Sequence, residues 1–201
     1  MKKRILSIII LIAVLMTFVS CKGNKNNNPD SEKTVYETLN DLSKQSYDKV
    51  NLNITTLTDD ITLNAFYVLT GNDVSYSIDQ LNLLPTDNDF SHLDSNYKTT
   101  IKGSAIIKDG RVVKLNNDDV NISTFSELRG NFIFNEENFN NVIVENGYFS
   151  ADVISPSDFW GMKKDVRDMK IVINYNNSAL EIITITYKTS NSEVTTVYMF
   201  S

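Results

Sequence analysis

From Val50 to its C-terminus, the chain alternates short apolar runs with turn-forming residues. The runs are rich in Ile, Val, Thr, Tyr and Phe, which favour β-strands. Turn signals separate consecutive runs at Thr70-Gly71-Asn72-Asp73, Asp109-Gly110 and Asn146-Gly147. The Gly in such turns accommodates the positive φ angles of a tight hairpin. The end of the chain predicts three consecutive antiparallel strands, Met169 to Tyr175, Leu180 to Tyr187 and Val194 to Phe200. We therefore expect a largely antiparallel sheet.

One amphipathic helix is predicted ahead of these strands. Val35, Leu39 and Leu42 recur at i, i+4 and i+7 and form one apolar stripe. We expect about four turns of helix, beginning at Ser31 with Asp30 and Ser31 as caps. An amphipathic helix needs an apolar partner, and the sheet provides it.

A second, short helix is predicted near Ser155. Pro156 suits the first helical position, and Ser155 with Asp158 three residues later resembles a capping box. Phe159 and Trp160 then place two large apolar groups on one turn.

The N-terminus is typical of a bacterial lipoprotein signal peptide. Lys2-Lys3-Arg4 precede an apolar run from Ile5 to Val19, and Ser20 precedes Cys21, the single cysteine of the chain. The residues around Cys21 resemble a lipobox, which implies diacylglyceryl attachment to its sulfur and cleavage just before it. The alternative is an uncleaved transmembrane anchor, but spanning a bilayer takes about 20 apolar residues and this run is shorter.

These features predict three parts of the chain. They are a signal peptide over residues 1–20, a lipidated cysteine with a flexible, Asn-rich tether over 21–31, and a single β-rich domain over 32–201. The expected location is the cell membrane, with the domain lipid-anchored and facing the extracytoplasmic side.

Charge and cysteine content narrow the possible partners. Removing the three cations of the signal changes the formal net charge from −6 to −9. Such an acidic domain is a poor partner for nucleic acid, whose binding needs clustered Lys and Arg. The acyl groups therefore have to provide the contact with the membrane. Beyond Cys21 no thiol remains for a disulfide or a cysteine-based metal site.

No sequence motif indicates catalysis, and we expect no enzyme activity, no cofactor and no metal. The single histidine, His92, lies in a loop with Asp87, Asp89 and Asp94. These oxygen ligands suit calcium, but the spacing matches no EF-hand, and a solvated polar loop is the alternative that we favour. No Gly-x-Ser-x-Gly elbow or phosphate-binding Gly-rich loop occurs.

The order of elements resembles the LolA-like lipoprotein-carrier fold over roughly residues 33–201. It consists of an N-terminal helix, a long antiparallel meander, a short interrupting helix and a terminal strand triplet. The resemblance implies an α+β, mostly β fold, in which a curved antiparallel sheet forms a half-barrel with one long N-terminal helix on its concave face. It also implies an apolar molecule held between helix and sheet, as in lipid-anchored relatives of that carrier. The carrier itself is a free shuttle, whereas this chain is predicted to be anchored.

The expected ligand site combines the helix stripe with a concentration of aromatic residues in one third of the chain. Its predicted residues are Val35, Leu39, Leu42, Phe132, Phe134, Tyr148, Phe159 and Trp160. The alternative is a filled core, because aromatic residues supply much of the buried area of any small β domain. The predicted function is binding or carrying an apolar or amphipathic ligand. The alternative function is an envelope protein-interaction module with no small-molecule ligand.

Overall fold

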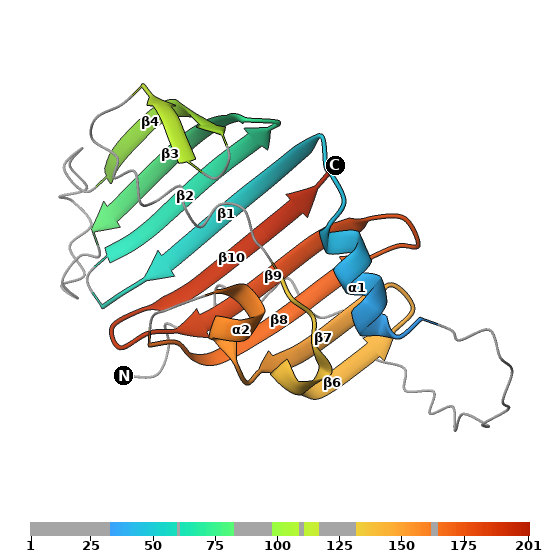
Figure 1. Ribbon diagram of the computed structural model, residues 1–201. Coiled ribbons are helices and arrows are strands. Elements are labelled where there is room, and N and C mark those ends of the chain that lie inside the picture. Colours follow the sequence, from blue (N-terminus) through green and yellow to red (C-terminus); the bar gives the residue numbers. More distant parts are fainter. Residues whose placement is uncertain (1–32, 60, 83–97, 109–110, 117–131, 162–164) are drawn as a thin grey trace, which may run out of the picture. The chain divides into compact units, whose positions relative to one another are not determined.

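The structure, a computed structural model, describes residues 33–59, 61–82, 98–108, 111–116, 132–161 and 165–201 (Figure 1). Lys33–Ser201 forms one compact unit. The predicted signal peptide, Cys21 and the His92 loop lie outside the described residues.

The described part of the chain contains ten strands in one sheet (Figure 1). The sheet is antiparallel, as the sequence predicted. The strands are β1 (Lys49–Leu57), β2 (Ile61–Thr70), β3 (Asp73–Asn82), β4 (Lys98–Lys108), β5 (Arg111–Leu115), β6 (Phe139–Glu145), β7 (Tyr148–Val153), β8 (Arg167–Tyr175), β9 (Leu180–Lys188) and β10 (Glu193–Phe200). Their order across the sheet is β5-β4-β3-β2-β1-β10-β9-β8-β7-β6. The sheet is therefore open, with β5 and β6 as its edges.

The central pair of the sheet joins two meanders. Strands β1 to β5 form one meander and β6 to β10 the other, and β1 pairs with β10 antiparallel from Val50 opposite Phe200 to Leu57 opposite Glu193. The sequence predicted the hairpins but not this contact between the first and last strands. Nothing local encodes the pairing, because it is made by residues far apart in the sequence.

Glycine is required at two of the hairpin turns. Gly71 lies between β2 and β3 with φ +58°, and Gly147 lies between β6 and β7 with φ +74°. A Cβ atom on Gly147 would stand 2.7 Å from the carbonyl oxygen of Tyr175. The backbone of β8 therefore excludes any side chain at this turn.

Helix α1 (Val35–Ser43) is shorter than the sequence predicted. It has nine residues and begins after Thr34, not at Ser31. Thr34 and Glu37 form a capping box, in which the Glu37 amide donates to Thr34 Oγ1 and the Thr34 amide to Glu37 Oε2. The helix ends where its apolar stripe ends, because the position four residues after Leu42 is Ser46 and offers no packing for a further turn.

Helix α2 (Pro156–Trp160) starts where the sequence predicted, with Pro156 in its first turn. The predicted capping box is wrong, since the Ser155 side chain makes no capping hydrogen bond. Backbone bonds hold the turn instead, from the amides of Asp158 and Phe159 to the Ser155 carbonyl. Gly161, with φ +69°, ends the helix.

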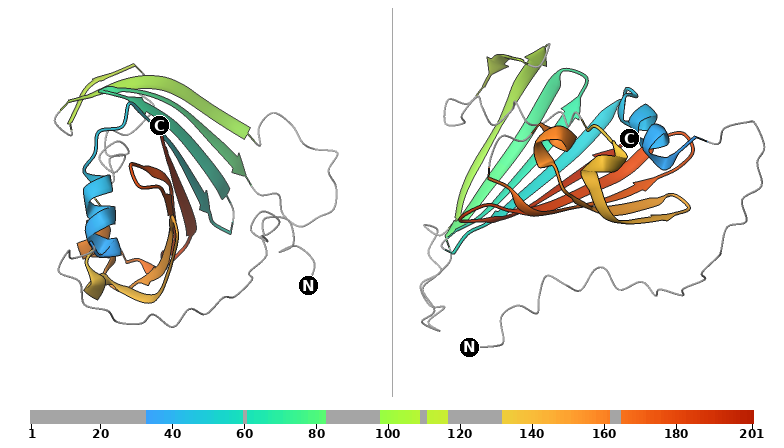
Figure 2. Two further views of the ribbon diagram at one scale, coloured as in Figure 1. Left: turned by 90° about the vertical axis from the view of Figure 1, so that its right-hand side faces the viewer. Right: turned by 60° about the horizontal axis from the view of Figure 1, so that its bottom comes forward.

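Both helices lie on the same face of the sheet, over the half formed by the second meander (Figures 1 and 2). Leu39 is fully buried and Leu42 nearly so, and α1 contacts β9. Besides α1 and α2, the described residues contain a short 3-10 helix, Glu136–Asn138. None of these helices has the length and apolar character that crossing a bilayer requires. These residues also contain no group of three or more His, Cys, Asp or Glu side chains that can hold a metal ion.

Candidate functional site

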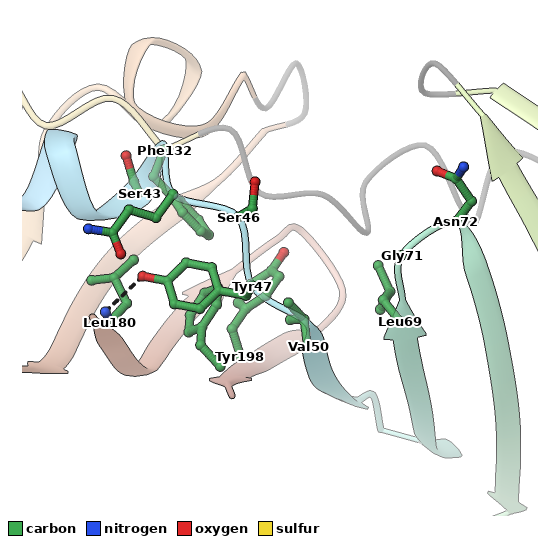
Figure 3. A pocket seen from close by; sticks show the side chains of 12 residues that line it. Ser43, Ser46, Tyr47, Val50, Leu69, Gly71, Asn72, Phe132, Leu180 and Tyr198 are labelled. Carbon is green, nitrogen blue, oxygen red and sulfur yellow. Dashed lines mark hydrogen bonds between the residues drawn. The ribbon is translucent and has the colours of Figure 1, made fainter. Parts of the chain in front are cut away.

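A pocket of about 390 Å³ lies between the C-terminal end of α1 and the sheet (Figure 3). Strands β1, β2, β9 and β10 contribute side chains to it, as do the α1–β1 connection and the segment before β6. Its apolar lining consists of Val50, Leu69, Phe132, Leu180, Tyr198 and Phe200.

The register of the sheet builds the apolar floor. Val50 of β1 stands opposite Leu69 of β2 on one side and Phe200 of β10 on the other. Residues directly opposite each other in an antiparallel sheet share a face, so these three side chains form a row. Tyr198 lies on the same face two residues before Phe200, because side chains alternate along a strand. The floor therefore depends on the β1–β10 pairing.

Tyr47 forms one wall and joins α1 to the sheet. Its hydroxyl donates to the Leu42 carbonyl at 3.1 Å and accepts from the Leu180 amide at 2.8 Å (Figure 3). Its ring lies against that of Phe200, with centroids 4.7 Å apart. Burial raises the pKa of Tyr47 above its ordinary value, and the hydrogen bond from Leu180 opposes this only in part. The phenol is therefore neutral at physiological pH.

The mouth of the pocket is polar but uncharged. Gln45, Ser46 and Asn72 are exposed there, and Ser43 is half-buried with its hydroxyl donating to the Asn40 carbonyl at 2.9 Å. None of the described residues that line the pocket is Asp, Glu, Lys or Arg. An apolar floor with a neutral hydrogen-bonding mouth suits an apolar or amphipathic molecule better than an ion.

Two hydrogen bonds hold the segment before β6, which borders the site, against α1. The Asn40 side chain donates from Nδ2 to the Phe134 carbonyl at 2.7 Å, and its Oδ1 accepts from the Phe134 amide at 2.9 Å. The same segment is also bound to α2, because the Ile133 amide donates to the Phe159 carbonyl at 2.9 Å. Phe132 is thereby fixed beside the pocket by contacts with both helices.

The structure brings most of the predicted ligand residues together, but as tightly packed core. Phe159 is fully buried, and its ring centroid is within 6 Å of those of Phe132, Phe134 and Phe139. Leu39 and Leu42 are buried beside this cluster, and Val35 and Trp160 are half-buried against it. The filled-core alternative therefore describes this cluster.

Two predicted residues have other positions. Phe132 is the one member of the predicted set that lines the pocket. Tyr148 is half-buried and precedes the fully buried Phe149, so it points to the opposite face of the sheet.

Sequence reasoning missed Tyr47, Val50, Leu69, Tyr198 and Phe200. Each strand residue among them belongs to an alternating apolar pattern within its own strand. Only the order of the strands in the sheet shows which of these residues become neighbours.

The chain matches no protein-family model, and no curated protein matches it in sequence.

Proposed function

We propose that this protein binds or carries an apolar or amphipathic ligand, without catalysis, in the pocket beside α1. The observation that carries the proposal is the combination of an apolar floor with an uncharged polar mouth in a space of about 390 Å³. Small-molecule pockets commonly measure about 300–1,000 Å³. This one is near the lower limit, which favours a small apolar molecule or a single acyl chain.

The arrangement of helices and sheet supports the same proposal. We infer a half-barrel, in which the open sheet curves around α1 and the helix lies on the concave face. The burial of Leu39 and Leu42 and the contact between α1 and β9 support this placement. It is the arrangement implied by the resemblance to the LolA-like fold, and it leaves space for a ligand where α1 ends.

The N-terminal residues support a lipid-anchored location outside the cytoplasm. Lys2-Lys3-Arg4, the apolar run and Cys21 together have the pattern of an acylated lipoprotein. Two acyl chains are enough for stable membrane attachment. We expect Cys21→Ser to abolish labelling by a radioactive fatty acid and to leave the precursor uncut. Unchanged labelling of this variant would show that the anchor is assigned wrongly.

The pocket suggests how a ligand lies in it. Leu69, Val50 and Phe200 form the continuous apolar row, so an acyl chain packs along them. A hydroxyl, ester or amide group then meets the side chains of Ser46 and Asn72 at the mouth. A strongly charged headgroup finds no counter-ion among the described lining residues.

A pair of matched substitutions tests the proposal. Val50→Trp fills the pocket, whereas Val68→Trp makes the same change on the opposite face of neighbouring strand β2. We expect the purified full chain to bind a fluorescent fatty-acid ester, an uncharged probe, because the described lining offers no counter-ion to a carboxylate. The Val50→Trp variant should bind it about tenfold or more weakly, which corresponds to about 1.4 kcal/mol or more. The Val68→Trp variant should bind like the unchanged chain.

Two results would contradict ligand binding in this pocket. One is an absence of binding by the unchanged chain, together with no co-purified lipid in native mass spectrometry. The other is equal binding by the Val50→Trp and Val68→Trp variants, which would place the probe elsewhere.

The alternative function, an envelope interaction module, is favoured by a different observation. Phe66 and Ile182 are 42% and 36% exposed on the face of the sheet away from the helices. A contiguous exposed apolar patch is a common feature of protein-interaction sites. On this face the half-buried Val68 follows Phe66 along β2, and the half-buried Met199 stands opposite Ile182. In cells that lack the gene, Phe66→Asp would then abolish complementation while Val50→Trp would preserve it. The reverse result would favour the ligand pocket.

A further inference from the structure

Strand β6 is an apolar strand at the edge of the sheet. Its three central residues, Val142, Ile143 and Val144, are 37%, 49% and 49% exposed, although neighbours on a strand point to opposite faces. No described strand pairs with its outer side. Exposed apolar edge strands readily pair with another chain, and proteins usually protect them with charges, bulges or a covering element.

The centre of β6, Val142-Ile143-Val144, is the same when read in either direction, with Asn141 before it and Glu145 after it. Two such strands, paired antiparallel and centred on Ile143, place valine opposite valine. Glu145 then falls opposite Asn141 of the other copy, so no two carboxylates meet. Like charges directly opposite each other would destabilise the pair.

The backbone confines this contact to a short stretch. The β6–β7 register shifts between Asn140 and Ile143, and Asn141 has a φ of +50°. Its side chain donates to Asp152 Oδ2 at 2.7 Å, which holds the irregular position in place. A bulge ends regular pairing on its strand. Val142 to Glu145 therefore remain as a regular edge.

We propose that β6 is a dimerisation edge, at which two copies of this chain join their sheets antiparallel about a two-fold axis at Ile143. A two-fold contact of this kind uses the same patch on both copies and is closed, so it produces a dimer and not a fibre. The pairing covers the exposed apolar residues of both edges at once. The proposal is independent of the ligand pocket, whose strand residues belong to β1, β2, β9 and β10, because β7 and β8 lie between these strands and β6.

Edge-to-edge growth through β5 is the competing arrangement of the same chain. Strand β5 is the other edge, and Val113 on it is 60% exposed. A β6–β5 contact is head-to-tail, leaves a free edge at each end and continues to grow. The two arrangements differ in which residues become neighbours, and this difference is the basis of the test.

Disulfide trapping tests the two-fold register. Directly opposite residues of an antiparallel pair have Cα atoms about 4.5–5.5 Å apart, within the range that a disulfide bridges. In the full chain on bacterial membranes, Ile143→Cys should form disulfide-linked dimers under mild oxidation. Val113→Cys is the control on the other edge and should form at least about tenfold fewer, because its copies do not meet. The unchanged chain measures any background from Cys21.

A charge swap gives a second measurement without an added cysteine. Ile143→Lys and Ile143→Glu each place like charges opposite each other, so each full chain in mild detergent should sediment as a monomer. Mixing the two variants should restore the dimer through the Lys–Glu pair. The proposal is overturned if the unchanged chain is a monomer at all concentrations tested. It is also overturned if Val113→Cys cross-links as well as Ile143→Cys, or if mixing restores nothing.

Discussion

The two halves of the sheet bury different kinds of side chain. In β7, β8 and β9, beneath the helices, the fully buried positions are large, namely Phe149, Ile171, Ile173, Ile183 and Ile185. In β2, β3 and β4 the buried positions are Ala65, Tyr67, Leu69, Val74, Tyr76, Ala105 and Ile107. Beneath the helices the fully buried positions are all large and apolar, while the other half mixes small residues and two tyrosines with two aliphatic side chains.

This difference explains where the pocket lies. The rings of Phe132, Phe134, Phe139 and Phe159 fill the space between α2 and the second meander. Helix α1 ends at Ser43, before it reaches β1 and β2, so the row formed by Val50 and Leu69 is not covered by helix. A space is left at the boundary between the two halves, where one packing arrangement ends and the other begins.

We expect the largest change in the free energy of unfolding from a substitution in the half of the sheet that the helices cover. Phe159→Ala removes the central ring of the cluster and should lower the free energy of unfolding by about 3–5 kcal/mol. Phe66→Ala, at a position on β2 that is 42% exposed, should lower it by about 1 kcal/mol. Urea unfolding of the full chain, followed by circular dichroism, measures both. Equal effects would show that the two positions are not packed differently.

Helix α1, which borders the pocket, should contribute to stability and not to ligand binding. Leu39 is fully buried and does not line the pocket. We therefore expect Leu39→Ala to cost about 2–5 kcal/mol of unfolding free energy. Binding of the fluorescent fatty-acid ester by the remaining folded protein should change little. A strong loss of binding with a small loss of stability would instead place the ligand beneath α1.

The link between α1 and the segment before β6 should have a smaller effect. Asn40→Ala removes both hydrogen bonds to Phe134 and leaves that backbone unpaired in a half-buried site, which should cost about 1–3 kcal/mol. Asn53→Ala, on the exposed face of β1, is the matched control and should be near neutral. The same unfolding measurement compares the two variants. An unchanged free energy of unfolding in Asn40→Ala would mean that these hydrogen bonds do not hold the segment before β6 in place.

The half with the tyrosines should be the more sensitive to alkali. Burial, and secondarily Tyr76, raises the pKa of Tyr67 from 10.0 to about 12. The unfolded chain therefore releases this proton first as the pH rises. The contribution of protonated Tyr67 to the free energy of unfolding is therefore complete below about pH 10. It is lost progressively towards pH 12, by about 1 kcal/mol per pH unit. Tyr67→Phe should flatten this decline in unfolding experiments at increasing pH, and an unchanged slope would exclude Tyr67 as its source.

Much of the fold was predictable from local signals. The Asn146-Gly147 turn gives Gly147 its positive φ, and the last three strands lie within two residues of their predicted bounds. The start of α2 at Pro156 was also predicted. The length of α1 was not, because the acidic and polar residues before Val35 resemble helix caps as much as Thr34 does, and only packing decides where a short helix begins.

The site was less predictable than the fold. The predicted aromatic residues other than Tyr148 lie close together, but the sequence does not distinguish a packed cluster from one that lines a space. Tyr47 illustrates the difficulty, since its hydroxyl joins Leu42, five residues away, to Leu180, which is 133 residues away.

The amino-acid pattern by itself determined that this chain forms an antiparallel sheet with short hairpins and an amphipathic helix, because alternation, turn glycines and helical spacing act over a few residues. The tertiary structure decided that β1 pairs with β10, that Val50, Leu69 and Phe200 lie in one row, and that β6 is left at an edge. Each of these is a contact between distant residues, whose pairing depends on how the whole sheet minimises exposed apolar area and unpaired backbone groups.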